Sequence, residues 1–446
     1  MLQAKVVKNI VYLLAASCLT NLSLFSINII LIRYLSKKDF GVFTLLVSIV
    51  YMYIAFSELG ISQGTIKYIS EHLTLGDLEY IRKHIRNFFF ATLIISLVFL
   101  LFFYLSLPVW KLFYNYLPTS YAVFLALIIF PYPVVRYWNA ITDGFQNMKY
   151  ALFFSVAREP LKLFILLCIT LFYHLNIRSA VILFVVSSYI TFIFSYLIYR
   201  LFLLRANITF EVAMDRDILF DKKKIRYFSY LYVSFLIFWI QPNVLYLIIG
   251  KFLNPENVAA FSSCFILNNI MWVFLLPVMD TLFPYISSIY STRSIFEGAK
   301  KKIYFVLFIV ITSAFIWVLF VYFFGYKVIA FFYGVKYIIY KNIFYLLSVS
   351  LFFDSFRTLF DPMLKGTIHA NILLYLELAR IIAIIIFGPV AIIYGGLPYL
   401  CYLLASLSFV INFIKGFLLG RLFPINILYF YVYAFCLFLI LFSFKD

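Results

Sequence analysis

Charged side chains within long apolar runs are the residues of this sequence whose types and spacing could do chemistry. The densest group is Arg158, Glu159 and Lys162, with Pro160 between them. Further charges in the same setting are Arg136, Asp143, Asp354, Arg357, Asp361, Glu377 and Arg380. An ionisable group at the centre of a membrane-spanning helix costs about 2.5 to 3.5 kcal/mol on insertion scales, so it normally faces a bundle interior or a wet cavity.

Two kinds of chemistry suit these residues. A guanidinium stays charged in a site of low dielectric constant and binds a phosphate through two parallel hydrogen bonds. The candidate ligands for an anionic group are Arg158, Arg380, Arg33, Lys251, Arg136, Arg357 and Lys162. The candidate groups for ion coupling, with H+ or Na+, are Glu159, Glu377 and Asp354.

A structural interpretation of the same residues stays open. Any single pair could simply hold two helices together, or its long side chains could reach the membrane surface. For Arg33 and Lys251, anchoring at the interface is the favoured interpretation. For Arg158 and Arg380 taken together, a functional role is favoured, because the two residues lie at matching positions of the two halves.

The sequence lacks the common catalytic motifs. It contains no H-E-x-x-H, G-x-S-x-G, P-loop or G-x-G-x-x-G, and its four histidines are scattered. The five cysteines lie in apolar stretches without C-x-x-C or zinc-site spacing. We therefore predict no catalytic residue, no metal and no cofactor.

The elements that must position these charges are long apolar helices. Of the 446 residues, 65% are hydrophobic and 12% are charged, whereas about half of a soluble domain is apolar. About 20 apolar residues make one spanning helix. Such runs lie near 9–32, 40–57, 86–107, 120–141, 151–173, 179–203, 228–249, 258–280, 303–323, 338–360, 370–394 and 397–420. We predict an all-α integral membrane protein with two six-helix bundles, and a last run at 425–444 as a thirteenth helix.

The distribution of basic residues orients these helices. Lys and Arg outnumber Asp and Glu by 36 to 18, an excess that in a soluble protein would suggest nucleic-acid binding. Here the basic residues gather in short gaps between apolar runs. With a cytoplasmic N-terminus, the gaps on the cytoplasmic side hold about twice as many basic residues as the gaps on the opposite side. Lys415 and Arg421 are counted in one of the cytoplasmic gaps. We therefore expect membrane lipid, and no nucleic acid, as a partner.

A polar interval divides the chain into two halves. Residues 204–227 contain four acids and the run Lys222-Lys223-Lys224, too polar a composition to enter lipid. The predicted domains are an N-terminal bundle at 1–203, a cytoplasmic linker at 204–227, a C-terminal bundle at 228–422 and an extra apolar helix at 423–446.

The two halves also match locally. The matches pair Arg33-Tyr-Leu35 with Lys251-Phe-Leu253, and Gly144 and Arg158 with Gly366 and Arg380, at offsets of 218 and 222 residues. Two six-helix halves with nearly equal offsets indicate a parallel repeat about the membrane normal. Arg158 and Arg380 would then enter a central cavity from equivalent helices.

Several motifs resemble those of a known family. They are Arg33-Tyr-Leu-Ser-Lys-Lys-Asp-Phe-Gly-Val-Phe43 within the stretch from Asn9, Glu58-Leu-Gly60 leading to Lys67-Tyr68, Asp143-Gly-Phe-Gln146 followed by Arg158, and Tyr394-Gly-Gly-Leu-Pro398. Over nearly the whole chain, the sequence resembles Wzx-like polysaccharide flippases of the multidrug/oligosaccharidyl-lipid/polysaccharide exporter superfamily. The thirteenth run is a departure from the twelve-helix core of that family.

The resemblance implies a function and a location. It implies two lobes, helices 1 to 6 and 7 to 12, around a cationic cavity that opens alternately to each side of the bacterial inner membrane. The substrate would be an undecaprenyl-pyrophosphate-linked oligosaccharide, such as an O-antigen unit, with contact to the polysaccharide polymerase machinery as a further expectation. The alternatives are a cation-coupled drug antiporter of the same superfamily and, from another class, an integral-membrane polysaccharide polymerase or acyltransferase.

Overall fold

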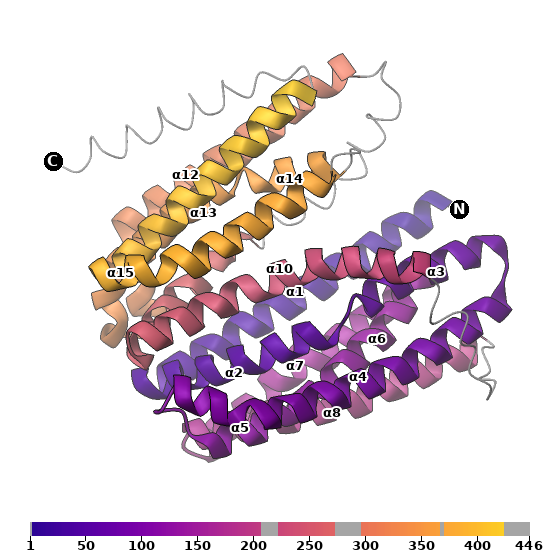
Figure 1. The fold of residues 1–446 in the computed structure, drawn as a ribbon, viewed down its shortest axis with the longest axis horizontal. Coiled ribbons are helices and arrows are strands. Elements are labelled where there is room, and N and C mark those ends of the chain that lie inside the picture. The colour runs from indigo at the N-terminus through magenta and orange to yellow at the C-terminus, as the bar shows by residue number, and fades with distance from the viewer. Residues whose placement is uncertain (1, 207–221, 273–295, 366–369, 423–446) are drawn as a thin grey trace. The chain divides into compact units, whose positions relative to one another are not determined.

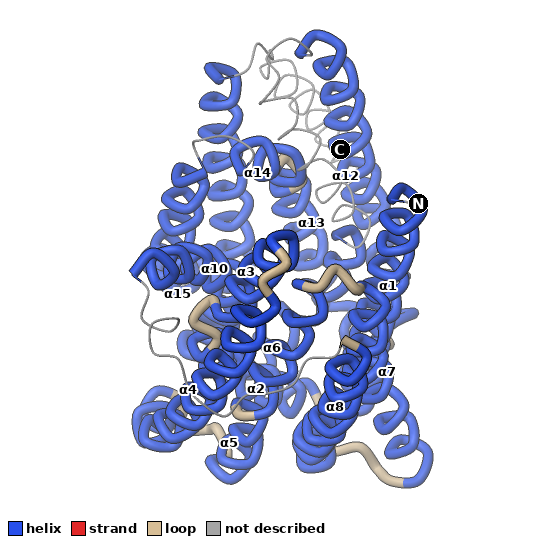
Figure 2. Tube along the Cα trace, turned by 90° about the vertical axis from the view of Figure 1, so that its right-hand side faces the viewer, coloured by secondary structure: helices blue, strands red, loops and turns tan. Residues whose placement is uncertain are grey.

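The computed structural model describes residues 2–206, 222–272, 296–365 and 370–422. Nearly all of them are helical, and Figure 2 shows no strand in these ranges. The chain forms two compact units, Met1–Lys251 and Phe252–Asp446 (Figure 1). The predicted all-α membrane architecture is confirmed.

The first unit is built mainly from long helices. They are α1 (Leu2–Tyr34), α2 (Lys37–Ser57), α3 (Ile61–Leu75), α4 (Leu78–Phe113), α5 (Thr119–Ala126), η1 (Leu127–Ile129), α6 (Pro131–Gly144), α7 (Met148–Phe172), α8 (Ile177–Arg205) and α10 (Lys222–Phe252). Short polar residues begin several of them. Ser36 accepts a hydrogen bond from the Asp39 N–H at 3.0 Å to begin α2, and Asn176 forms a capping box with Ser179 to begin α8.

The second unit is also built from helices. It contains a helix over residues 255–272, then α12 (Phe296–Tyr333), η3 (Val335–Tyr340), α13 (Lys341–Asp354), α14 (Arg357–Lys365) and α15 (Ala370–Leu422). The 53 residues of α15 form two helices across a kink at Gly395 and Gly396. Gly396 has a φ of 67°, a conformation that glycine adopts without steric cost. The kink falls between the predicted runs 370–394 and 397–420.

Eight helical segments of the described residues are long and apolar enough to cross a membrane. They are Ala15–Tyr34, Lys37–Leu75, Leu78–Phe113, Thr119–Gly144, Ile177–Arg205, Tyr304–Tyr333, Val335–Asp354 and Asn371–Gly420. α7 is not among them, because Arg158, Glu159 and Lys162 lie in its middle. The predicted run 258–280 is described only to residue 272, and most of the 204–227 linker and the last run at 425–444 lie outside the described residues.

A break between α2 and α3 places an acidic residue inside the first unit. Glu58, Leu59 and Gly60 separate the two helices, and Leu59 and Gly60 have φ values of 43° and 73°. A positive φ is uncommon for a residue with a branched side chain, so the backbone is held in this turn by its surroundings. Glu58 is buried within the unit as a result.

The end of α10 is fastened to the segment after α4. The bonds run from the Tyr114 hydroxyl to the Leu247 carbonyl at 2.8 Å, from the Tyr116 hydroxyl to the Gly250 carbonyl at 2.6 Å, and from Lys251 Nζ to the Phe113 carbonyl at 3.1 Å. The last two acceptors lie at helix ends, where carbonyls lack intrahelical partners. Burial raises the pKa of Tyr116 to about 12, so this donor stays protonated.

Close packing holds the same end of α10. A Cβ at Gly250 would lie 2.6 Å from a methyl carbon of Leu45 on α2, so a larger residue here would displace the Leu45 side chain. α10 therefore belongs to the first compact unit by its contacts. The division of the sequence into repeats at 1–203 and 228–422 stays a prediction.

One assignment from the charge pattern is wrong. The charge pattern places Lys415 in a cytoplasmic gap, yet it lies in the second arm of α15 with none of its surface exposed. It is retained there by the Asp361 and Glu377 carboxylates, at 2.8 and 2.7 Å. A lysine near the end of an apolar run is thus an internal partner here and carries no information on orientation.

Candidate functional site

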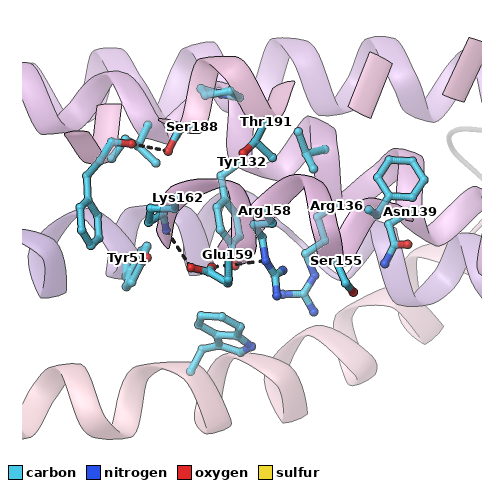
Figure 3. A pocket seen from close by; sticks show the side chains of 16 residues that line it. Tyr51, Tyr132, Arg136, Asn139, Ser155, Arg158, Glu159, Lys162, Ser188 and Thr191 are labelled. Carbon is cyan, nitrogen blue, oxygen red and sulfur yellow. Dashed lines mark hydrogen bonds and ion pairs between the residues drawn. The ribbon is translucent and has the colours of Figure 1, made fainter. Parts of the chain in front are cut away.

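The first unit contains a cavity of about 310 Å³. Its lining includes Tyr51 from α2, Tyr132, Arg136 and Asn139 from α6, Ser155, Arg158, Glu159 and Lys162 from α7, Ser188 and Thr191 from α8, and Trp239 from α10. Figure 3 shows the charged side chains of α6 and α7 at its centre. Three of the predicted cationic ligands, Arg158, Arg136 and Lys162, and the predicted coupling residue Glu159 thus share one cavity.

Helical spacing explains why α7 supplies most of the charge. Ser155, Arg158, Glu159 and Lys162 follow one another at intervals of three, one and three residues. Residues three or four apart lie on one face of a helix, so all four side chains line the same cavity. The opposite face of α7 carries exposed apolar residues such as Phe153 and Phe164, as a helix in contact with lipid requires.

The three charges of α7 are not equivalent. Lys162 Nζ donates a hydrogen bond to Glu159 Oε2 at 3.1 Å, and Arg158 Nε lies 3.4 Å from Glu159 Oε1. The Lys162 and Glu159 side chains are 8% and 10% exposed, whereas the Arg158 side chain is 41% exposed. Arg158 is therefore the member of this group that a bound molecule can reach.

Arg136 brings a second guanidinium to the cavity and is braced from two sides. Its Nε lies 2.8 Å from Glu58 Oε1, at the break between α2 and α3, and its guanidinium carbon lies 5.5 Å from the centre of the Trp239 ring. Figure 3 shows the guanidinium groups of Arg136 and Arg158 projecting in the same direction. Two such groups can together bind a doubly charged anion such as a pyrophosphate.

The charges around the cavity do not cancel. Arg136, Arg158 and Lys162 contribute three positive charges, and Glu58 and Glu159 contribute two negative charges among the described residues of this cluster. One positive charge remains. In a site of low dielectric constant this excess favours an anionic ligand and opposes a cationic one.

Aromatic and small polar side chains complete the lining. The Tyr51 ring centre lies 6.1 Å from that of Tyr132 and 6.4 Å from that of Trp239. Asn139, Ser155 and Thr191 add amide and hydroxyl groups. A pocket with apolar and aromatic rings and a few polar groups is typical of small-molecule sites.

The second unit holds a charged cluster of another kind. The pairs are Arg380 Nη2 with Asp354 Oδ2 at 2.8 Å, Arg357 Nε with Asp361 Oδ2 at 2.8 Å, Arg357 Nη2 with Glu377 Oε2 at 3.6 Å, and Lys415 Nζ with Asp361 Oδ1 at 2.8 Å and Glu377 Oε1 at 2.7 Å. Three cations face three anions among the described residues. Arg380 also donates to the Ser408 hydroxyl at 2.8 Å. The structure thus places two predicted ligands, Arg380 and Arg357, in a balanced and buried network.

The predicted coupling residues all have cationic partners. Lys162 lies 3.1 Å from Glu159, Lys415 lies 2.7 Å from Glu377, and Arg380 lies 2.8 Å from Asp354. A coupling ion would have to compete with these ammonium and guanidinium groups. Ion coupling at these residues stays a prediction.

The remaining predicted ligands lie apart from the cavity lining. Arg33 is exposed in the last turn of α1. Lys251 Nζ donates to the Phe113 carbonyl and lies 5.1 Å from the centre of the Phe113 ring. This contact favours the anchoring interpretation of Lys251.

Two charged partners and an aromatic one are not predicted from the sequence. Glu58 belongs to a family motif, and the Leu-Gly that follows it is the only signal of the helix break that turns its side chain inward. The charge pattern places Lys415 in a gap between helices. Trp239 gave no signal of its own, because its position beside Arg136 depends on how α10 packs against α6.

Comparison with known proteins identifies the fold. Residues 6–290 match a family model described as polysaccharide biosynthesis protein. No curated protein matches the sequence. Solved structures with the same fold include an inward-facing multidrug resistance MATE family transporter of the MOP superfamily, with 19% identity, a TM-score of 0.76 and coverage of 92% of this chain and 95% of that chain.

Two further structures are similar along nearly their whole length. One is an outward-facing MATE family transporter of the MOP superfamily, with 20% identity, a TM-score of 0.64 and coverage of 95% and 96%. The other is a MOP superfamily transporter from Pyrococcus furiosus described as having a binding pocket of reverse polarity that suggests a different function, with 20% identity, a TM-score of 0.64 and coverage of 93% and 95%. At these identities the likeness shows the fold alone.

Proposed function

The chain belongs to the polysaccharide biosynthesis protein family, and on that premise we propose that it is a flippase for lipid-linked oligosaccharides. The substrate is an undecaprenyl-pyrophosphate-linked repeat unit, such as an O-antigen unit. The protein moves it from the cytoplasmic to the outer leaflet of a bacterial inner membrane by alternating access. The coarser conclusion, a multi-pass membrane protein with a transporter fold, is shown by the family match and the similar structures.

The observation that carries the proposal is the partly exposed side chain of Arg158 in a cavity with excess positive charge. Two opposite unit charges 4 Å apart attract by about 4 kcal/mol at an effective dielectric constant of 20. Arg158 and Arg136 side by side therefore favour a pyrophosphate strongly. The polar and aromatic lining around them suits the sugar that follows the pyrophosphate.

The alternative of cation-coupled drug efflux has support from the MATE transporters that share the fold. The charge of the cavity argues against it, because a cationic drug would meet one uncompensated positive charge. A transport assay with a cationic dye separates the two functions. If the protein exports the dye, and the Arg158→Ala variant exports it equally well, drug efflux is the favoured function.

Replacement of Arg158 tests the proposal directly. In proteoliposomes that contain the purified protein, Arg158→Ala should reduce translocation of an undecaprenyl-pyrophosphate-linked sugar by at least about tenfold, because the exposed cation that binds the pyrophosphate is lost. Arg158→Lys should retain part of the activity. Lys149→Ala is the matched control, since Lys149 is exposed on the same helix and does not line the cavity. Full activity of Arg158→Ala would exclude the proposed site.

The proposed orientation has its own test. With the N-terminus in the cytoplasm, a cysteine in place of Lys223 should resist a membrane-impermeant thiol reagent in intact cells and react after the cells are opened. Labelling in intact cells would show that the predicted orientation is wrong. The proposed partners, the polymerase machinery and a coupling ion, H+ or Na+, would then be sought on the corrected sides.

A further inference from the structure

We propose that Lys162 is a positioning residue that neutralises Glu159 and thereby leaves the charge of Arg158 to the transported anion. This inference deepens the proposed function and rests on it. It assigns to a buried lysine of the cavity wall a role that does not involve contact with the substrate.

Helix geometry selects the partner of Glu159. Residues three apart face each other on a helix, whereas neighbours in sequence point in different directions. Lys162, three residues after Glu159, makes the hydrogen bond of 3.1 Å to Oε2. Arg158, the sequence neighbour, reaches Oε1 only through its Nε, at 3.4 Å.

Burial separates the roles of the two cations. The side chains of Lys162 and Glu159 are 8% and 10% exposed, and Lys162 Nζ lies 4.7 Å from the centre of the Phe184 ring. An ammonium over an aromatic ring and against a carboxylate is held from two sides. The Arg158 side chain, at 41% exposed, is the accessible one. A ligand in the cavity therefore meets Arg158, while Lys162 acts through Glu159.

Loss of Lys162 alone should redirect Arg158. A buried carboxylate without a partner is strongly unfavourable, and the nearest remaining cation is Arg158, already 3.4 Å from Oε1. Arg158 would turn to pair fully with Glu159, and its charge would no longer be available to an anion. Removal of the carboxylate as well should release Arg158 again.

The test is a binding cycle on the full-length protein in lipid nanodiscs, with undecaprenyl pyrophosphate as the probe. Lys162→Met should weaken binding by about tenfold or more. The double variant Lys162→Met with Glu159→Gln should return to within about threefold of the parent protein, and Lys162→Arg should bind like the parent. A purely structural role for Lys162 would make the double variant as weak as the single one, and that result would overturn the inference.

Two further variants separate this inference from the proposed function. Arg158→Ala should lose binding; if it binds normally, the anion site itself is wrong, and the inference falls with it. If Arg158→Ala loses binding and Lys162→Met does not, only the inference is overturned. Glu159→Gln keeps the test decisive if Lys162→Met fails to fold. This variant should bind undecaprenyl pyrophosphate at least as tightly as the parent protein. Weaker binding would contradict the role of Glu159 as a competitor for Arg158.

Discussion

Arg158 and Arg380 occupy corresponding places in the sequence, each fourteen residues after a glycine, but their surroundings differ. Arg158 is part of a cluster with one excess positive charge and is substantially exposed to a cavity. Arg380 is 3% exposed and is bound to Asp354 and Ser408 within a cluster whose described charges balance. Two positions that match in the sequence thus have different surroundings, which fit the binding role proposed for Arg158 and a cohesive role for Arg380.

The difference follows from the number of acids in each charged cluster. In the second unit, Asp354, Asp361 and Glu377 each meet a cation within 2.8 Å. In the first unit, Glu58 and Glu159 must serve three cations. Removal of a residue from the balanced cluster should therefore affect stability most, and removal of Arg158 should affect binding most.

The largest loss of stability is expected for Lys415→Met. The substitution leaves Asp361 and Glu377 with less positive charge in a buried site, and the loss of one partner of a buried ion pair costs about 3 to 5 kcal/mol. Thermal unfolding of the detergent-solubilised protein should show a much lower midpoint. Lys327→Met, at an exposed lysine of α12 in the same unit, should leave the midpoint nearly unchanged. Equal midpoints for both variants would show that the buried network does not stabilise the unit.

A slightly smaller loss is expected for Arg380→Ala. Asp354 would lose its cation and Ser408 its donor, at a cost of roughly 2 to 4 kcal/mol. The same unfolding assay measures it, and transport per folded molecule should fall less than in Arg158→Ala. A variant with normal stability but no transport would contradict the comparison and return Arg380 to the substrate path.

An intermediate outcome is expected for Arg136→Ala. Arg136 lines the cavity and also pairs with the buried Glu58 at 2.8 Å. The variant should lose about 1 to 3 kcal/mol of stability, because a buried acceptor remains, and should also bind undecaprenyl pyrophosphate more weakly. The double variant Arg136→Ala with Glu58→Gln should recover stability without recovering binding. Recovery of both would assign Arg136 a structural role only.

Much of this architecture could be predicted from the sequence, for a physical reason. A span of about 20 apolar residues is required by the thickness of the bilayer, so the run at 179–203 coincides closely with α8 and the run at 303–323 lies within α12. The intramembrane charges were also visible, because each one stands out against its apolar neighbours. Arg158, Glu159 and Lys162 lie on one cavity because helical spacing fixes their common face.

Pairing between helices could not be predicted in the same way. Lys415 pairs with Glu377, 38 residues away in the sequence, and Arg136 on α6 pairs with Glu58 at the break after α2. These contacts depend on which helices pack together and on how far each is rotated, and neither quantity is encoded in the local pattern. The internal partner of each intramembrane charge is therefore seen only in the structure.

The fastening of α10 to the segment after α4 has a consequence for how the protein is made. The Tyr116 hydroxyl and the Gly250 carbonyl are 134 residues apart in the chain. Ribosomes add about 5 to 20 residues per second, so Tyr114 and Tyr116 wait roughly 7 to 27 seconds after their own synthesis before their acceptors exist. During that interval the wall of the cavity that carries Trp239 is missing. The first unit is therefore complete only after α10 has been synthesised and inserted. The sequence pattern alone assigns this helix to the second half.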